Sequence, residues 1–99
     1  MPRQDRIRVE WDPRKSDQNR RKHGIDFSVA MQVFYDPLKF VEIEGYDHGE
    51  ARWRTISEID GRIFVVSHTI REEDDVEIIR IISARKATPR ERKVYAEAP

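Results

Sequence analysis

The spacing of apolar residues changes near residue 39, and this change constrains the fold more than any other feature of the chain. Before it, apolar side chains recur with helical spacing at Phe27, Ala30, Met31 and Phe34. Asp26 is a suitable N-cap for this amphipathic helix, and Asp36-Pro37 is a suitable stop. After residue 39, apolar and polar residues alternate with a period of two, which is typical of half-buried strands. The sequence therefore predicts helices first and a sheet afterwards.

Four strand candidates occupy the second part of the chain. They are Lys39 to Glu44, Arg52 to Ile59, Ile63 to Ile70 and Val76 to Arg85. Short polar turns separate them, including Asp60-Gly61 in a hairpin position, and short connections favour antiparallel pairing. The last two candidates contain continuous apolar runs, so we expect them at the centre of the sheet.

Both ends of the chain carry start and stop signals. Ile7 to Trp11 alternates and predicts a strand, which we expect at a sheet edge. Asp12-Pro13 predicts the start of a helix that runs to His23 and ends at Gly24. Thr88 to Glu91 has the pattern of a capping box, which predicts a short terminal helix.

Together these elements predict one α+β domain over residues 1–99. Two N-terminal helices pack on an antiparallel sheet of about four strands, and a short helix ends the chain. The chain of 99 residues has room for one modest core, and its lack of cysteine excludes disulfides and thiolate sites. No apolar run approaches the roughly 20 residues of a membrane span, so we expect no membrane partner and a soluble cytoplasmic protein.

The charges are unevenly distributed although the formal net charge is 0. Residues 1–24 hold eight Lys/Arg and four Asp/Glu, and residues 80–99 hold six and two. Residues 25–79 between them hold five Lys/Arg and thirteen Asp/Glu. Two basic ends therefore bracket an acidic middle, which indicates either separate surfaces for different partners or an ordinary mixed surface.

The last strand candidate ends in polar and charged residues that a buried strand does not need. The segment from Arg80 to Thr88 contains two arginines and a serine and ends at the residue that caps the next helix. By the two-residue period, Ser83 and Arg85 share one face and Arg80 points to the other. Because a buried guanidinium requires a negative partner, the arginines indicate either structural ion pairs or an anion site at the strand end.

The first helix contains no large apolar side chain between residues 13 and 23, so its own hydrophobic face cannot hold it. Four polar side chains fall within an arc of about 80 to 100° on one side. They are Lys15, Asn19, Lys22 and His23. This side is either solvated, with the helix anchored by its neighbours, or a surface that contacts phosphates.

Other chemistries have little support in the sequence. His23, His48 and His68 lack the spacing of paired metal ligands, and Glu72 to Asp75 resembles a solvated turn. The Gly-x-Ser-x-Gly motif and glycine-rich phosphate loops are absent from the sequence. We therefore expect neither a metal nor a cofactor.

Three blocks of the sequence resemble the BrnT family of type II toxins. The first block is Trp11-Asp12-Pro13-x-Lys15-x-x-x-Asn19-x-x-Lys22-His23-Gly24-Ile25-x-Phe27. A looser middle block contains Glu50-x-Arg52, Gly61-Arg62, Val65-Val66 and Thr69. The last block is Arg80-Ile81-Ile82-Ser83-Ala84-Arg85-Lys86-Ala87 with Glu91. Ser57 and His68 depart from the family pattern, where a glycine and an aromatic residue are expected.

This resemblance implies a RelE-like fold and a sequence-tolerant ribonuclease that inhibits translation and growth. It also implies a BrnA-like antitoxin with a ribbon-helix-helix domain, so operator DNA would be contacted only indirectly, through the antitoxin. Two alternatives from other classes are a nucleic-acid-binding module that does not cleave and a subunit that only binds an acidic partner.

Metal-free RNA cleavage proceeds by attack of the 2′-hydroxyl on the adjacent phosphate, which requires cations and groups that move protons. The candidate catalytic residues are Lys22, Arg52 and Arg85 for charge, with Thr69 and Ser83 for hydrogen bonds. The candidate substrate-binding residues are Lys15, Asn19, His23, His68 and Arg80. Either His23 or His68 would transfer protons. Arg80 could instead pair with a carboxylate, and we expect Glu91 to cap the terminal helix rather than act as a base.

Overall fold

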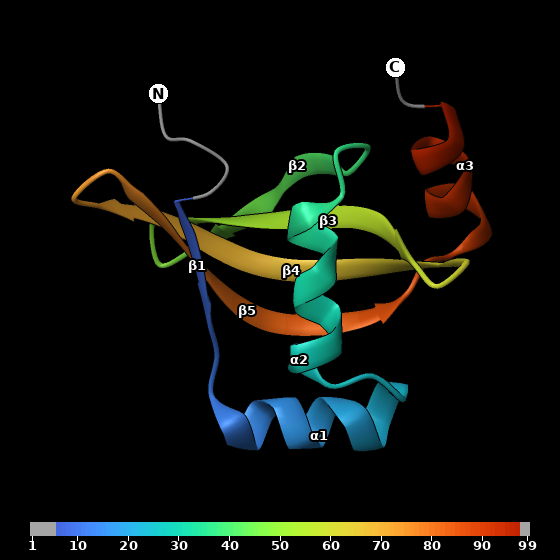
Figure 1. The fold of residues 1–99 in the computed structure, drawn as a ribbon, viewed down its shortest axis with the longest axis horizontal. Helices are drawn as coiled ribbons and strands as arrows, with labels where there is room; N and C mark the ends of the chain where they lie inside the picture. The colour runs from blue at the N-terminus through green and yellow to red at the C-terminus, as the bar shows by residue number, and fades with distance from the viewer. Residues whose placement is uncertain (1–5, 98–99) are drawn as a thin grey trace.

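A computed structural model describes residues 6–97, which form one mixed sheet and a set of helices (Figure 1). The strands are β1 (Ile7–Glu10), β2 (Phe40–Asp47), β3 (Glu50–Ile59), β4 (Arg62–Glu73) and β5 (Val76–Lys86). The helices are α1 (Pro13–His23), α2 (Phe27–Ala30), the 3₁₀ helix η1 (Met31–Tyr35) and α3 (Pro89–Glu97). The α+β class predicted from the sequence is confirmed.

The strand order in the sheet is β1-β5-β4-β3-β2. Strands β2 to β5 pair antiparallel with their sequence neighbours, and β4 lies at the centre with β5 beside it, as predicted. β1 lies at an edge, also as predicted, but it pairs parallel to β5. The prediction of about four antiparallel strands was therefore wrong in strand number and in part of the pairing, because alternation predicts a strand but not its partner or direction.

The second predicted helix is present in two pieces. Asp26 caps α2 by accepting a 3.0 Å hydrogen bond from the Val29 amide, and the chain then tightens into η1. Apolar side chains three and four residues apart face the sheet in either helix type, so the spacing did not distinguish them. The Asp60-Gly61 turn is confirmed as a two-residue hairpin turn, with both φ angles positive at +49° and +81°.

The helices α1, α2 and η1 cover one face of the sheet, which we call the helix face. Figure 1 shows α2 and η1 crossing this face, while α1 runs along β5 beyond the end of β1. The core on the helix face contains Phe27, Ala30, Val33, Phe34, Val66, Ile79, Ile81 and Ala84. A smaller cluster on the other face joins α3 to the sheet through Ile56, Val65, Ala87, Val94 and Tyr95.

The capping box of α3 is confirmed. The Glu91 amide donates to Thr88 Oγ1 at 3.2 Å, and the Thr88 amide donates to Glu91 Oε1 at 2.9 Å. The Tyr95 hydroxyl donates to Asp36 Oδ2 at 2.7 Å, which ties α3 to the loop after η1. Across residues 6–97, none of the helices has the length and apolar character that crossing a membrane requires.

Candidate functional site

The face opposite the helix face, which we call the open face, carries most of the predicted catalytic residues. Residues that pair across the strands point to the same side, so they form rows. One row is Glu42, Arg54, Ser67 and Ser83, and the next is Phe40, Ile56, Val65 and Arg85. A third row contains Arg52, Thr69, Arg80 and Glu10. Arg52 belongs to it because Trp53, the next residue of β3, pairs with His68, which precedes Thr69 on β4.

A bulge in β5 places Arg80 in this arrangement. Ser67 pairs with Ser83 but the next residue, His68, pairs with Ile81, so Ile82 is an extra residue. The bulge shifts the alternation by one, and Arg80 lies on the same face as Ser83 and Arg85. The prediction that Arg80 points to the other face was therefore wrong, since the two-residue period assumes an uninterrupted strand.

Arg85 lies near the end of β5 and forms a bidentate ion pair with Glu91. Its Nη1 and Nη2 atoms donate to Glu91 Oε1 and Oε2 at 2.7 and 2.9 Å. The Arg85 guanidinium, together with the Thr88 amide, lowers the pKa of Glu91 to about 2. The Arg85 side chain stays 39% exposed while Glu91 is 15% exposed, so the carboxylate holds a guanidinium that solvent still reaches. The prediction that Glu91 caps α3 is confirmed, and a carboxylate with so low a pKa is a poor base.

Carboxylates also hold the other groups near Arg85. Ser67 Oγ donates to Glu44 Oε2 at 2.7 Å, and Arg54 Nε donates to Glu42 Oε1 at 2.7 Å. A hollow of about 460 Å³ opens beside them, lined by Glu42, Arg54, Ile56, Thr88, Arg90, Glu91 and Val94. Sequence reasoning did not select Arg54 and Ser67, although the spacing Arg52-x-Arg54 on one strand could have indicated a shared face.

The third row is an ion-pair network at the other end of the open face. Glu10 accepts from Arg80 Nη1 at 2.9 Å and from Arg71 Nη2 at 3.0 Å, and the two arginines lower the pKa of Glu10. The sequence left two alternatives for Arg80, a structural ion pair or an anion site, and the structure shows the ion pair. Arg52 lies 3.4 Å from Asp47 Oδ2 and is 39% exposed, and Thr69 lies between Arg52 and Arg80 in the row.

Polar contacts anchor α1, as expected for a helix without a hydrophobic face. Asn19 is buried, and its Nδ2 donates 2.8 Å hydrogen bonds to the carbonyls of Ile25 and Ala84. Its Oδ1 accepts from the Ala84 amide at 3.2 Å, so one side chain pairs with β5 beyond the end of β1. Ser16 Oγ accepts from the Phe27 amide at 2.8 Å. Asn19 was predicted to bind substrate, but its side-chain amide instead forms the hydrogen bonds that hold α1 to the sheet.

The remaining polar residues of this helix side face outward beside the open face. Lys15 and Lys22 are exposed and His23 is half-buried. With Ile82 and Ser83 they line a hollow of about 240 Å³. Ser83 therefore connects the α1 surface to the row next to Arg85.

His68 lies in the core rather than at the site. It is 1% exposed, its Nε2 is 2.7 Å from Thr55 Oγ1, and its ring packs edge-on against Phe34 with centroids 4.9 Å apart. Burial lowers its pKa to about 4, so the ring is neutral at physiological pH. The structure places this predicted substrate-binding residue out of contact with solvent, because β4 alternation points it to the helix face.

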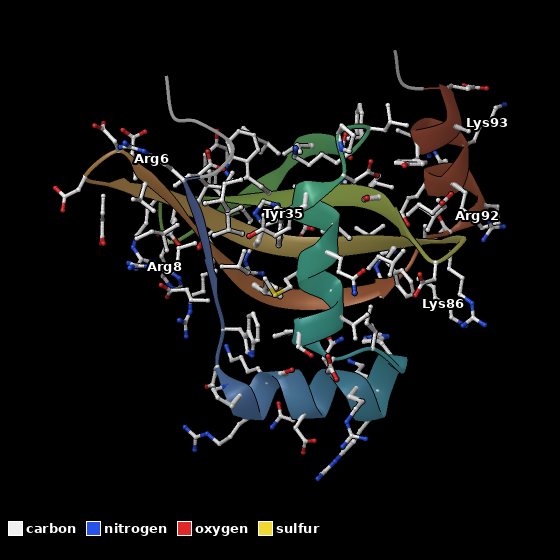
Figure 2. All side chains as sticks on the ribbon, in the orientation of Figure 1. Arg6, Arg8, Tyr35, Lys86, Arg92 and Lys93 are labelled. Carbon is white, nitrogen blue, oxygen red and sulfur yellow. The ribbon has the colours of Figure 1, made fainter. Side chains whose placement is uncertain are left out.

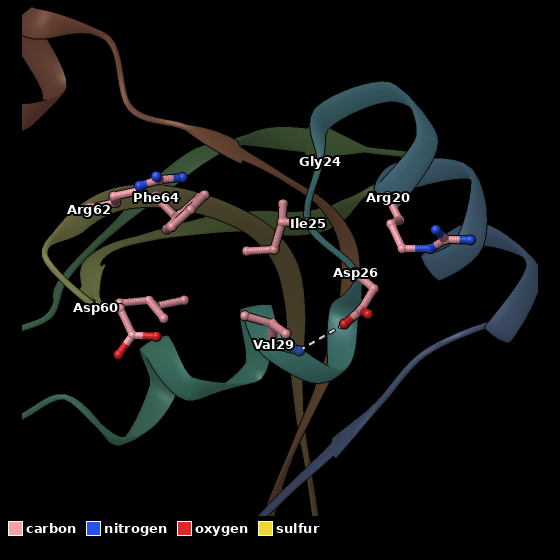
Figure 3. A pocket seen from close by; sticks show the side chains of 9 residues that line it. Arg20, Gly24, Ile25, Asp26, Val29, Asp60, Arg62 and Phe64 are labelled. Carbon is pink, nitrogen blue, oxygen red and sulfur yellow. Dashed lines mark hydrogen bonds between the residues drawn. The ribbon is translucent and has the colours of Figure 1, made fainter.

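A separate hollow of about 350 Å³ lies between the end of α1 and the β3–β4 turn (Figure 3). Arg20, Asp26, Asp60 and Arg62 surround it, and Ile25 and Phe64 contribute apolar surface. None of the predicted site residues lines it.

Further basic residues lie at a distance from α1, on other elements of the structure. Figure 2 shows Arg8 beside β1, and Lys86, Arg92 and Lys93 around the end of β5 and α3.

A comparison with known protein families identifies the chain. Residues 11–91, which are more than half of the chain, match the family described as BrnT, the ribonuclease toxin of a type II toxin-antitoxin system. The chain belongs to the BrnT family. No curated protein matches it significantly.

Membership of the BrnT family implies an RNA substrate and an antitoxin partner. The matched range begins at Trp11, before α1, and ends at Glu91, the carboxylate that holds Arg85. It contains all ten site residues predicted from the sequence. α1 and the end of β5, which carry the predicted site cations Lys15, Lys22 and Arg85, thus both belong to the BrnT-like part of the chain.

Proposed function

We propose that this protein is a metal-independent endoribonuclease that cleaves RNA in the cytoplasm and thereby inhibits translation and growth. A BrnA-like antitoxin with a ribbon-helix-helix domain neutralises it, and operator DNA is contacted only through that antitoxin. The observation that carries the proposal is the exposed guanidinium of Arg85, fixed by Glu91 beside two serines on the open face of a BrnT-family chain.

The proposed reaction is attack of a ribose 2′-hydroxyl on the adjacent phosphate. Negative charge grows on the phosphate oxygens during this attack, and a positioned guanidinium stabilises that charge. Arg85 is suited to this role because both outer nitrogens are oriented by Glu91 while the side chain remains reachable. Ser83, in the row next to Arg85, and Thr69, in the third row, supply hydrogen bonds.

Lys22 and Lys15 bind the neighbouring phosphates in this proposal, because they line the hollow that reaches Ser83. Neither lysine forms an ion pair with a described carboxylate. Arg52 and Arg80 extend the cationic surface along the third row, where RNA would compete with their carboxylate partners.

Proton transfer is assigned to His23. Glu91 is ionised and engaged by Arg85, and His68 is buried with Thr55, so neither can exchange protons with a bound ribose. His23 is half-buried and lines the same hollow as Lys22 and Ser83. An imidazole at that position can accept the 2′-hydroxyl proton.

Substitution of Arg85 tests the proposal directly. Arg85→Ala should reduce RNA cleavage by about 10²- to 10³-fold, the usual effect of removing one oxyanion donor. Cleavage is measured on purified, partner-free protein with EDTA present, and growth inhibition is measured in parallel. The matched control is Arg21→Ala, which removes an arginine that pairs with Asp17 on another side of α1.

Two outcomes would contradict the proposal. A folded Arg85→Ala protein with full cleavage activity would remove Arg85 from the site. Wild-type protein that binds RNA but does not cleave it would favour a nucleic-acid-binding module. The partner is tested by co-purification with the product of the adjacent reading frame, which should bind the toxin and suppress cleavage.

A further inference from the structure

The outer edge of β2 is open in the described part of the chain. β2 pairs with β3 and ends the strand order, so the backbone groups along its other side have no strand partner among residues 6–97. Such an edge can accept an additional strand. The pairing with β3 is regular from Phe40 to Ile43, and a bulge follows at Glu44.

The two faces of β2 have different chemistry. Val41, Ile43 and Tyr46 pair with β3 residues of the helix face, yet they are 39%, 45% and 71% exposed. Figure 1 shows the reason: α2 and η1 cross the sheet over its middle and leave β2 at the margin. Leu38, just before the strand, is 70% exposed, and Tyr35 at the end of η1, labelled in Figure 2, is 55% exposed.

The other side of the same strand is acidic. Glu42 and Glu44 lie on the open face, Asp47 ends the strand, and β2 contains no lysine or arginine. Glu42 accepts from Arg54 and Glu44 accepts from Ser67, each through one oxygen, while Asp47 contacts His48 and Arg52 through its two oxygens. A carboxylate has about four acceptor sites, so Glu42 and Glu44 keep further acceptor capacity. β2 is therefore apolar on one side and carries carboxylates on the other.

The apolar side and the acidic side of β2 together determine which kind of partner fits its open edge. A nucleic acid is disfavoured, since its phosphates would meet carboxylates and apolar side chains. A second copy that paired through its own β2 would bring the carboxylates of both copies together, which is unfavourable. An extended segment in which apolar residues alternate with lysine or arginine satisfies both sides at once.

We propose that an extended segment of the antitoxin, with apolar side chains alternating with basic ones, adds a strand to β2 at this edge. The identity of the partner rests on the proposed function, whereas the chemistry of the segment rests on β2 itself. Docking at this edge leaves the rest of the antitoxin available to cover Arg85 on β5, which is separated from β2 by β3 and β4.

The test compares two variants of the full chain in binding to the product of the adjacent reading frame. Val41→Thr with Ile43→Thr keeps strand-forming residues but removes exposed apolar surface, and it should weaken binding at least tenfold in titration calorimetry. The matched control is Val29→Thr, since Val29 on α2 is 38% exposed, much as Val41 is. The control should change the affinity less than twofold. Hydrogen exchange of the β2 amides should slow in the wild-type complex.

The outcomes separate this inference from the proposed function. Unchanged affinity in the double variant together with unchanged β2 exchange would overturn the docking site. Slow β2 exchange in a concentration-dependent dimer of the toxin alone would assign the edge to a second copy and also overturn it. The free double variant should cleave RNA as the wild type does. If neither the wild type nor the double variant cleaves RNA, the proposed function is contradicted, but the binding result can still be interpreted.

Discussion

The two faces of the sheet use alternate residues of the same strands for different purposes. On the helix face, polar groups such as His68 and Thr55 are buried and satisfy each other. On the open face, arginines such as Arg54, Arg80 and Arg85 pair with carboxylates and remain partly exposed. The larger hydrophobic cluster lies on the helix face, so the open face can hold charges that stay available to a ligand.

The largest expected effect on stability comes from the helix face. Ile81→Ala should reduce the free energy of unfolding by about 2–4 kcal/mol, because Ile81 is 2% exposed in the core and its removal leaves a cavity. Thr69→Ala on the open face should cost less than about 1 kcal/mol. Urea unfolding of both variants measures the contrast. Equal losses would contradict the division between the faces.

The pH dependence of the helix face should depend on His68. Its pKa is lowered from 6.5 to about 4, so the folded state favours the neutral ring. The neutral ring therefore contributes about 2–3 kcal/mol to the free energy of unfolding. This contribution is complete above pH 6.5 and is lost as the pH falls to 4. Replacing both partners, in Thr55→Val with His68→Phe, should remove this dependence.

Urea unfolding between pH 7 and 4 measures the change at His68. His48→Gln is the matched control, since the His48 side chain is 95% exposed in a turn. A double variant that keeps the wild-type pH profile would show that another group titrates in this range.

The open face should respond at lower pH and more weakly. The pKa of Glu91 is lowered from 4.5 to about 2, so its contribution is present above pH 4.5 and is lost as the pH falls to 2. Because Arg85 is 39% exposed, solvent screening reduces the contribution to about 1–2 kcal/mol. Glu91→Gln can keep the cap while removing the charge, so the variant should lose less stability than the wild type between pH 5 and 2. If the free energy of unfolding falls equally in the wild type and in Glu91→Gln between pH 5 and 2, Glu91 does not stabilise the fold through its charge.

The smallest expected effect concerns phosphate binding by α1. Lys15→Ala with Lys22→Ala should reduce the log-log salt slope of RNA binding by about 0.7 for each lost contact with single-stranded RNA. The matched control is Arg14→Ala with Arg21→Ala, which removes two exposed arginines of the same helix. An unchanged slope in the lysine variant would assign this surface to the antitoxin or to the fold.

Local signals predicted many elements correctly because the groups that decide them are close in sequence. Asp12-Pro13 and Gly24 delimit α1, Asp60-Gly61 makes a hairpin turn, and Thr88 with Glu91 caps α3. Arg85 was selected for the same reason, since its strand and the following cap are adjacent in the chain.

Other features depended on partners far along the chain. The parallel pairing of β1 is made with β5, about 70 residues later, and Asn19 pairs with Ala84, 65 residues later. The bulge at Ile82 moved Arg80 to the open face, and contacts with Thr55 of β3 and Phe34 of η1 bury His68 in the core. None of these contacts leaves a periodic signal within one segment.

Signals within the sequence were enough to predict the α+β class, the ends of α1 and α3, the hairpin strands and, through the motifs, the BrnT family. These properties follow from short-range sterics, capping hydrogen bonds and side-chain periodicity. Contacts in the folded chain determine which arginines share a face, which histidine is accessible and that Glu91 binds Arg85 through both oxygens. Those outcomes depend on register and on packing between distant segments, and a shift of one residue in a strand reverses the face of every side chain beyond it.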